Sequence, residues 1–247
     1  GHDINYLALT GILEAIGREG QPPSIPLNLV GDYAGGSLYM AVGLLAAVLE
    51  ARQSGRGQVV DAAIVDGAAH LATTFHGMVA GGLWKPGRGN NISDSGSHFY
   101  VCYECADGRW IAVGPIEEKF FQQLLAKLDI DAASLPPQMS REHWKETKAV
   151  LAARFKTRTR DEWAQALEAS DACASPVLSF AEAPGHAHMK ARGTFVELDG
   201  IVQAAPAPRF SRTAPDLPTP PRAASADSLS AWLPAARIES ARDQGLI

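Results

Sequence analysis

The sequence has little cysteine, no strong excess of charge and no long basic run. Its 247 residues include only three cysteines, an odd number that does not make a disulfide framework, so we expect a reducing cytoplasmic compartment. The net charge is −5, which argues against a nucleic-acid scaffold and predicts no nucleic-acid partner. With 46% hydrophobic and 20% charged residues, the composition is that of a globular chain and excludes an intrinsically disordered one.

The sequence also lacks a long uninterrupted apolar run. The longest, residues 34–49, is shorter than the roughly 20 residues of a membrane span and contains three glycines, so we expect a buried helix and no membrane partner. The chain does not open with a basic segment followed by an apolar one, so we expect no secretory signal. It begins with Gly1 instead of Met, and we expect either a processed start or a piece of something longer.

The first third of the chain has the spacing of helices. Apolar residues over 4–16 recur at helical intervals with an interruption at Gly11. Asp32 precedes the long apolar stretch and is expected to cap that helix, which should end near Gly55. Residues 57–67 predict a short buried strand that turns into another helix, in a βαβ type of organisation.

A loop rich in glycine and proline, residues 83–96, separates this region from one of different texture. We therefore expect three parts: residues 1–95, a small α+β domain over 96–185, and a return segment with an extended tail over 186–247. Asp107–Gly108 joins two strand-like runs and predicts a hairpin. The other expected elements are helices at 117–128, 141–155 and 159–169, strands at 176–178 and 194–198, and a proline-rich tail from residue 204.

Two pairs of potential metal ligands do not make a metal site. Cys102 and Cys105 are three apart on an expected strand, so they point to opposite faces, and no second pair lies at a spacing that would complete four zinc ligands. His186 and His188 lack an acidic or cysteine partner at a supporting spacing. Asp3, just before an apolar helical run, is by itself an ordinary helix cap.

Several segments, one after another along the chain, match motifs of one known family. The first is Gly1-His2-Asp3-Ile4-Asn5-Tyr6-Leu7-Ala8-Leu9-Thr10-Gly11, which is followed in order by further segments. These are residues 26–36, 57–62, 65–67, 99–100, 103–109, 112–117 and 186–195. In this order the segments resemble racemases of the family III CoA-transferase superfamily that act on 2-methylacyl-CoA thioesters. Several motifs in the right order are more specific than any one of them alone.

The resemblance implies a fold and a reaction. The fold is α/β, the remainder of a Rossmann-like large domain plus a small α+β domain, in an interlocked homodimer. The reaction is a proton transfer at the α carbon of an acyl-CoA thioester, with coenzyme A as part of the substrate and no covalently bound cofactor. Asp3 matches the family's catalytic aspartate, and we predict that His2, Asn90 and Asp94 bind substrate. The family's catalytic histidine lies upstream of this motif, so we expect the chain to be the C-terminal portion of a racemase.

The sequence departs from the family pattern at two places. Gly87 stands where many of these racemases have an acidic residue before Arg-Gly, and Ser97-His98 replaces the usual Ala-Pro. We expect His98 to be a surface histidine on a strand. Two other functions stay open: a CoA-transferase in which Asp3 is the nucleophile, and an inactive fragment that only oligomerises.

Overall fold

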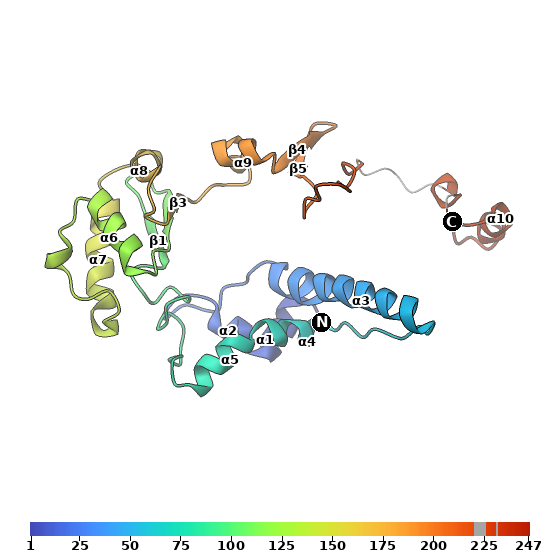
Figure 1. The fold of residues 1–247 in the computed structure, drawn as a ribbon, viewed down its shortest axis with the longest axis horizontal. Coiled ribbons are helices and arrows are strands. Elements are labelled where there is room, and N and C mark those ends of the chain that lie inside the picture. The colour runs from blue at the N-terminus through green and yellow to red at the C-terminus, as the bar shows by residue number, and fades with distance from the viewer. Residues whose placement is uncertain (220–225, 231) are drawn as a thin grey trace. The chain divides into compact units, whose positions relative to one another are not determined.

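The computed structural model describes residues 1–219, 226–230 and 232–247 (Figure 1). These residues form two compact units, Gly1–Val177 and Leu178–Ile247. The domain boundaries expected at residues 95 and 185 stay predictions. Residues 220–225, which include the end of the expected proline-rich tail, lie outside the described part of the chain.

The first part of unit 1 is helical. Its elements are α1 (Asp3–Thr10), α2 (Ile12–Ala15), the π-helix η1 (Leu29–Leu38), α3 (Tyr39–Ser54), α4 (Ile64–Leu71) and α5 (Thr73–Ala80). The predicted interruption at Gly11 is confirmed, because Gly11 separates α1 from α2 with a φ of 82°, a left-handed conformation that glycine adopts without strain. Glycines also let η1 and α4 pack backbone to backbone, since a Cβ built on Gly67 would overlap the carbonyl of Gly35.

The prediction of a buried strand within residues 57–67 is wrong. Residues 57–63 are extended without strand pairing, and the Val59 side chain is 94% exposed. An extended segment becomes a strand only when a neighbouring strand satisfies its backbone hydrogen bonds, and no described residue pairs with it. The helix predicted to follow is confirmed as α4.

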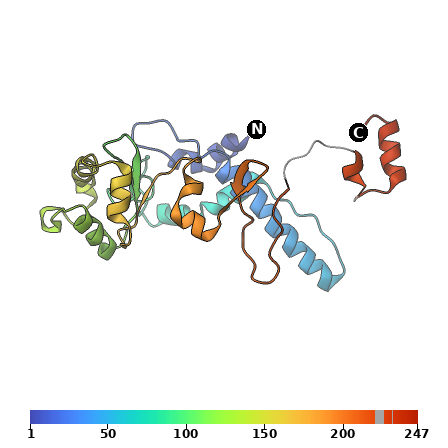
Figure 2. The same cartoon turned by 90° about the horizontal axis from the view of Figure 1, so that it is seen from above.

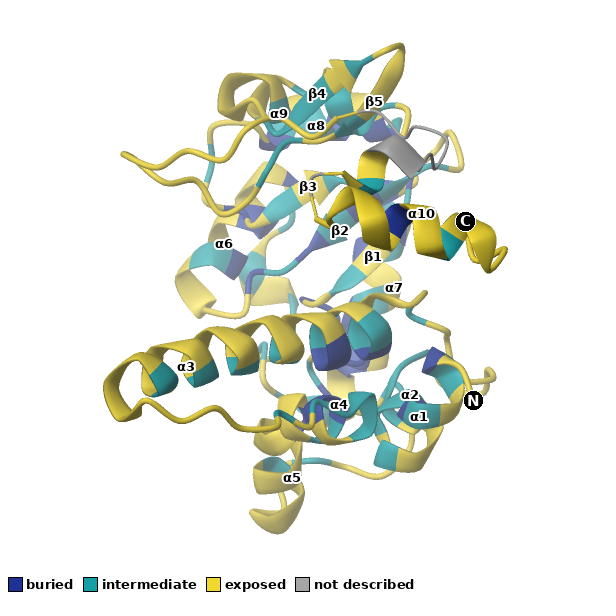
Figure 3. Cartoon of the chain, turned by 90° about the vertical axis from the view of Figure 1, so that its right-hand side faces the viewer, coloured by how far each residue is buried: buried dark blue, intermediate teal, exposed yellow. Residues whose placement is uncertain are grey.

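The prediction of a buried apolar helix is also wrong. Residues Leu29–Ser54 form one helical stretch, with a mean hydropathy of 1.5 over its most apolar window, of which only 11% is buried. By length and composition this stretch is one that could cross a membrane. Figure 3 shows α3 as mostly exposed, with intermediate residues at intervals along it and no buried residue. Its exposed large apolar side chains are Met40, Val42, Leu44, Leu45, Val48 and Leu49. An apolar face of this size is typical of an interaction surface.

The second part of unit 1 is a three-stranded antiparallel sheet with helices packed on it. The strands are β1 (Val101–Glu104), β2 (Trp110–Val113) and β3 (Ala174–Pro176), in the order β1-β2-β3. The helices are α6 (Glu118–Lys127), η2 (Ala132–Ser134), η3 (Arg141–His143), α7 (Trp144–Phe155) and α8 (Arg160–Leu167). The predicted hairpin is confirmed, and the predicted start of the third helix is confirmed by a capping box in which Thr159 and Glu162 bond each other's backbone N–H.

The main hydrophobic core of the described residues lies in this second part. Phe99, Tyr103, Phe155 and Trp163 are all buried there. Tyr103 and Phe155 stack with ring centroids 5.0 Å apart. Because the face of the sheet that carries Tyr103 packs into this core, the side chains that alternate with Tyr103 lie on the opposite face.

Unit 2 contains a short helix, a hairpin and a C-terminal helix. Its elements are η4 (Ala183–Gly185), α9 (Ala187–Arg192), β4 (Phe195–Leu198), β5 (Ile201–Ala204), η5 (Ala226–Leu229) and α10 (Ala235–Asp243). The strand predicted at 194–198 is confirmed as β4, and it pairs antiparallel with β5. The chain after β5 continues as a loop, as Figure 2 shows. Residues 205–219 contain no helix or strand. The extended tail expected in this region stays a prediction.

Candidate active site

Asp3 is the first residue of α1, and its carboxylate points at the backbone of η1. The Asp32 N–H donates a 2.7 Å hydrogen bond to Asp3 Oδ2. Asp32 therefore lies inside η1 and does not cap the following helix, which corrects the sequence prediction. The side chain of Asp3 is buried, with a residue exposure of 7%. It lies against backbone polar groups, so it is not enclosed by apolar side chains alone.

Gly31 sets how closely η1 approaches this carboxylate. A Cβ built on Gly31 would overlap both Asp3 Oδ2 and Asp3 Cγ. Any other residue at this position would therefore push the carboxylate away from the Asp32 N–H. The absence of a side chain at Gly31 is the local reason why the Asp3 carboxylate sits where it does.

The two oxygens of Asp3 have different surroundings. Oδ2 accepts the Asp32 N–H, whereas Oδ1 has no hydrogen-bond partner among the described residues although it is buried. A buried polar atom without a partner is rare in native proteins and calls for an explanation in function or in a bound group. An oriented carboxylate with one free oxygen is the arrangement that a general base needs.

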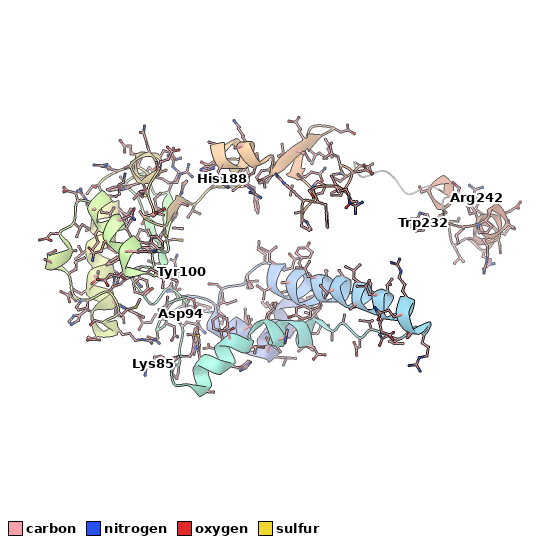
Figure 4. All side chains as sticks on the ribbon, viewed as in Figure 1. Lys85, Asp94, Tyr100, His188, Trp232 and Arg242 are labelled. Carbon is pink, nitrogen blue, oxygen red and sulfur yellow. The ribbon has the colours of Figure 1, made fainter. Side chains whose placement is uncertain are left out.

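The two other polar residues predicted to bind substrate organise the loop between α5 and β1. Asp94 is buried and accepts hydrogen bonds from the Asn90 and Gly96 backbones and from both the backbone and the side chain of Asn91. The Asn90 amide donates to Pro86 O at 2.9 Å. Figure 4 marks Asp94 on this loop. These contacts give both residues a structural role, and their contact with substrate stays a prediction.

His2 precedes α1 and is exposed, and its backbone N–H donates to Asn5 Oδ1 at 2.9 Å. His2 is next to Asp3 in the sequence, but no described contact joins the two side chains. The predicted site residues are not gathered around one cavity, because Asp94 lines the large cavity described below whereas Asp3, His2 and Asn90 do not. The role predicted for His2 stays a prediction.

Gly87 occupies a left-handed turn in this same loop, with a φ of 81°. Its neighbour Arg88 folds back onto the helical region, where Nη1 donates to Glu14 O and Oε1 at 3.0 and 2.9 Å, and Nη2 donates to Gln21 O at 2.9 Å. The left-handed conformation favours glycine over the acidic residue of the family pattern. Arg88 therefore anchors the loop to the segment after α1.

A cavity of about 910 Å³ lies within unit 1, and sequence reasoning missed it. Thr10 and Gly11 at the end of α1, Phe75 and Val79 of α5, and one face of the β1–β2–β3 sheet contribute to its walls. The signal in the sequence was weak, because only Cys102, Ala112 and Ser175 are small residues at positions that alternate with core residues of the strands. That alternation distinguishes the core face from the cavity face.

His98 is buried, with an exposure of 1%, so the prediction of a surface histidine is wrong. Its ring lies 5.1 Å from the rings of both Phe99 and Phe121, and neither ring nitrogen has a hydrogen-bond partner among the described residues. Burial, and next the charge of Lys148, lower the pKa of the imidazole from 6.5 to about 4. His98 is therefore part of the core, where its ring packs against the rings of Phe99 and Phe121.

This burial predicts an acid-sensitive fold. Because the pKa of His98 is lower in the folded than in the unfolded chain, its contribution to stability is complete above pH 6.5 and falls as the pH decreases toward 4. The loss amounts to about 3 kcal/mol at most. We expect His98→Phe to reduce the difference between the urea midpoints at pH 7 and pH 4.5, and an unchanged difference would contradict this. Because each protein's midpoint at pH 4.5 is compared with its own midpoint at pH 7, any change in packing that is the same at both pH values cancels.

The cysteines have no catalytic or metal-binding arrangement in the described part of the chain. Cys102 is exposed, Cys105 is buried, and no group of three or more possible ligands occurs among the described residues. We expect Cys102→Ser and Cys105→Ser to leave activity within a few-fold of wild type and to leave the zinc content of the purified protein unchanged. A loss of bound zinc in either variant would show that the thiols are ligands.

Comparison with known proteins decides the family. Residues 1–225 match CoA-transferase family III. The chain belongs to CoA-transferase family III. It is 45% identical over 224 residues to alpha-methylacyl-CoA racemase of Mus musculus and 43% identical over 220 residues to that of Homo sapiens. These matches cover 90% and 89% of this chain, and the chain spans 58% and 57% of the two relatives.

The fold is that of the family as well. A CAIB/BAIF family protein from Brucella suis has a similar structure, with a TM-score of 0.72 and 22% sequence identity. The similarity covers 97% of this chain and 62% of that chain. The family-level resemblance seen in the sequence motifs and the mixed α/β fold expected from them are thereby confirmed.

Proposed function

We propose that the polypeptide to which these 247 residues belong is a 2-methylacyl-CoA racemase, and that Asp3 is one of its two catalytic acid/base groups. The observation that carries the proposal is the Asp3 carboxylate, with Oδ2 held by the Asp32 N–H and Oδ1 left without a described partner. The racemase relatives, at 45% and 43% identity, support the same reaction class.

The chemistry requires two groups, one on each side of the reacting carbon. The proton at C2 of a thioester is weakly acidic, so its removal needs a base within hydrogen-bond reach and donors that stabilise the enolate oxygen. Asp3 Oδ1 removes or returns the proton on one face. A histidine outside these residues, as in the family pattern, acts on the other face. Coenzyme A enters as part of the substrate, and the reaction needs no covalently bound cofactor.

Isotope exchange tests this proposal. The full-length protein that contains this chain is incubated with a (2R)-2-methylacyl-CoA in deuterated water, without an acceptor acid. A racemase incorporates deuterium at C2 and produces the (2S) epimer. Absence of both exchange and epimerisation would refute the proposed activity.

The same family includes CoA-transferases, and the same substrate distinguishes the two reactions. In a transferase, Asp3 would attack the thioester carbonyl and carry the acyl group, so product would form only when an acceptor carboxylic acid is added. The Asp3 carboxylate is held in place by a backbone N–H, which suits proton transfer. Transfer to an added acid without exchange at C2 would favour the transferase. If only oligomerisation is detected, the chain is an inactive fragment.

We also propose that the protein is a cytoplasmic homodimer that binds neither nucleic acid nor membranes. The exposed apolar side chains of α3 support a protein partner, because contiguous apolar surfaces of soluble proteins mark interaction sites. The cysteines, all unpaired, suit a reducing compartment. Sedimentation of the full-length protein with and without vesicles tests the oligomeric state and the absence of membrane binding.

A further inference from the structure

Strand β1 lies at one edge of the three-stranded sheet, because the strand order is β1-β2-β3. In an antiparallel sheet the backbone N–H and C=O groups of successive residues point alternately to the two sides of the strand. Val177 N–H donates to Trp110 O at 2.9 Å, so the backbone of Trp110 bonds toward β3. Glu104 is opposite Trp110 in the register. The N–H and C=O of Glu104, and those of Cys102 two residues earlier, therefore point away from the sheet.

These outward backbone groups of β1 have no hydrogen-bond partner among the described residues. A strand edge with free N–H and C=O groups is a template onto which another chain can add as a further strand. Peptide-recognition domains bind extended peptides in this way, with main-chain hydrogen bonds for affinity and alternate side chains for specificity. The edge of β1 therefore has the backbone chemistry of a peptide-binding site.

A groove of about 520 Å³ follows this edge. All four residues of β1, Val101–Glu104, line it. Side chains of consecutive strand residues point to opposite faces of the sheet, so a groove that meets four in a row runs along the edge itself. Helix α7 borders the groove on the core face of the sheet, where Phe155 stacks on Tyr103. An extended segment with one residue about every 3.3 Å can lie along the whole of β1.

Lysines of the α7 region give the groove its charge. Lys145 and Lys148 lie one turn apart on α7, Lys156 follows the end of the helix, and all three line the groove. Lys145 Nζ pairs with Glu19 Oε2 and Lys156 Nζ with Glu104 Oε2, each at 2.8 Å. The ion pair with Glu104 brings the Lys156 ammonium to the strand edge, where an added strand would lie.

Two further positive charges in the groove have no carboxylate paired with them in the described part of the chain. Lys148 Nζ donates to Ser95 O at 2.6 Å and to Gly96 O at 2.9 Å, which are neutral acceptors. The guanidinium of Arg18 lies over the Trp110 ring, 5.7 Å from its centroid. Four cations and two carboxylates line the groove, which leaves an excess of two positive charges. This excess favours an anionic occupant.

We propose that the edge of β1 binds an extended acidic peptide of another protein, which adds to the sheet as a fourth strand. Side chains of the added strand on the core face meet the lysines, so acidic residues suit these positions. Side chains on the other face lie toward the 910 Å³ cavity, which shares Val101 and Cys102 with the groove and has mostly apolar walls. The favoured peptide therefore alternates acidic and apolar residues. A second copy of this edge would bring lysines against lysines, which disfavours it as the partner.

Binding of a synthetic peptide tests the proposal. Fluorescein-labelled Glu-Val-Glu-Val-Glu-Val-Glu is titrated with the full-length protein, and fluorescence anisotropy measures the Kd. We expect saturable binding that weakens when the salt concentration is raised about tenfold, because salt screens the charges. The comparison peptide Glu-Glu-Glu-Glu-Val-Val-Val has the same composition without the alternation, and we expect it to bind about tenfold more weakly. Equal binding of the two peptides, or binding of neither, would overturn the proposal.

Cys102→Pro tests the pairing of backbones. Proline is tolerated on an edge strand where its nitrogen faces outward, so this variant removes the outward N–H of residue 102 and keeps the bonds between β1 and β2. Cys102→Ser is the matched control, because it changes the same side chain and keeps the N–H. We expect Kd for the alternating peptide to rise about fivefold to tenfold in Cys102→Pro, as for the loss of one hydrogen bond, and to stay within about twofold in Cys102→Ser. Unchanged binding to a folded Cys102→Pro protein would refute strand addition.

A pair of lysine substitutions tests the charge independently of the strand. Lys145→Gln with Lys156→Gln removes two charges from the groove, whereas Lys119→Gln with Lys127→Gln removes two from exposed positions on α6 that do not line it. We expect Kd to rise about fivefold in the first protein and to stay within about twofold in the second. Equal weakening in both would mean attraction by net charge alone and refute the site. The assay contains no thioester, so its outcome does not depend on the proposed racemase function.

Discussion

Asp3→Asn is expected to abolish racemisation in both directions in the full-length protein. The amide has the same shape as the carboxylate, and its oxygen can still accept the hydrogen bond from the Asp32 N–H. The amide nitrogen then takes the place of Oδ1, where it cannot accept a proton. We expect the rate of deuterium exchange at C2 to fall by about 10²–10⁴-fold, the usual contribution of a positioned acid or base.

Exchange started from the (2R) and from the (2S) thioester measures this loss in each direction. Asp66→Asn is the matched control, because Asp66 lies in the first turn of α4 and is exposed, so the substitution removes an acidic residue from a similar helix position. Circular dichroism and the thermal midpoint of each variant report on folding. Near-normal turnover of a folded Asp3→Asn protein would remove Asp3 from the mechanism.

Local signals in the sequence predicted local structure well. Gly11 divides α1 from α2, Asp107 and Gly108 turn the hairpin between β1 and β2, and Thr159 caps the start of α8. Each of these features depends on residues that are neighbours in the chain. The backbone conformation of a glycine or the reach of a capping hydroxyl is fixed over a few residues, so the sequence contains the information directly.

The sequence predictions that failed concern contacts between distant segments. Asp32 has the residue type of a helix cap, but its N–H is used by a carboxylate 29 positions earlier. His98 is polar, yet Phe99 and Phe121 enclose it. Val59 lies in an apolar run that no described strand pairs with. Hydrophobic periodicity shows which side chains prefer burial, but it does not show what is available to bury them.

The candidate site likewise has a part that could be predicted from neighbouring residues and a part that depends on contacts between distant segments. The motif around Asp3 could be found from the family resemblance, because Asp3 and the residues that carry the resemblance are neighbours in the sequence. The catalytic role of Asp3 stays a proposal. The closeness of Gly31 to the Asp3 carboxylate could not be found, since it requires the fold to bring η1 onto the start of α1. The sequence shows that Gly31 lies in a glycine-rich segment with Gly35 and Gly36, but it does not show which carboxylate Gly31 contacts.

Gly31→Ala is therefore expected to impair catalysis although it adds a single methyl group. The new Cβ would occupy the position of Asp3 Oδ2, so the carboxylate must rotate away from the Asp32 N–H or η1 must move outward. A misplacement of about 1 Å in a catalytic group costs about 10²-fold in rate. We expect kcat to fall by about that factor, with KM nearly unchanged because the substrate-binding surface is not altered.

A second glycine separates this effect from a general loss of helix packing. A Cβ built on Gly43 in α3 meets only Val60 Cγ1, at 2.8 Å, which is a side-chain atom that can move. Alanine also favours a helix over glycine by about 1 kcal/mol, so Gly43→Ala should keep its thermal midpoint and its activity. Gly31→Ala should keep most of its stability and lose kcat. If both variants lose activity in proportion to their stability, the role of Gly31 is packing alone. A loss of kcat in Gly31→Ala at a nearly unchanged midpoint instead means that the missing side chain positions the carboxylate for proton transfer.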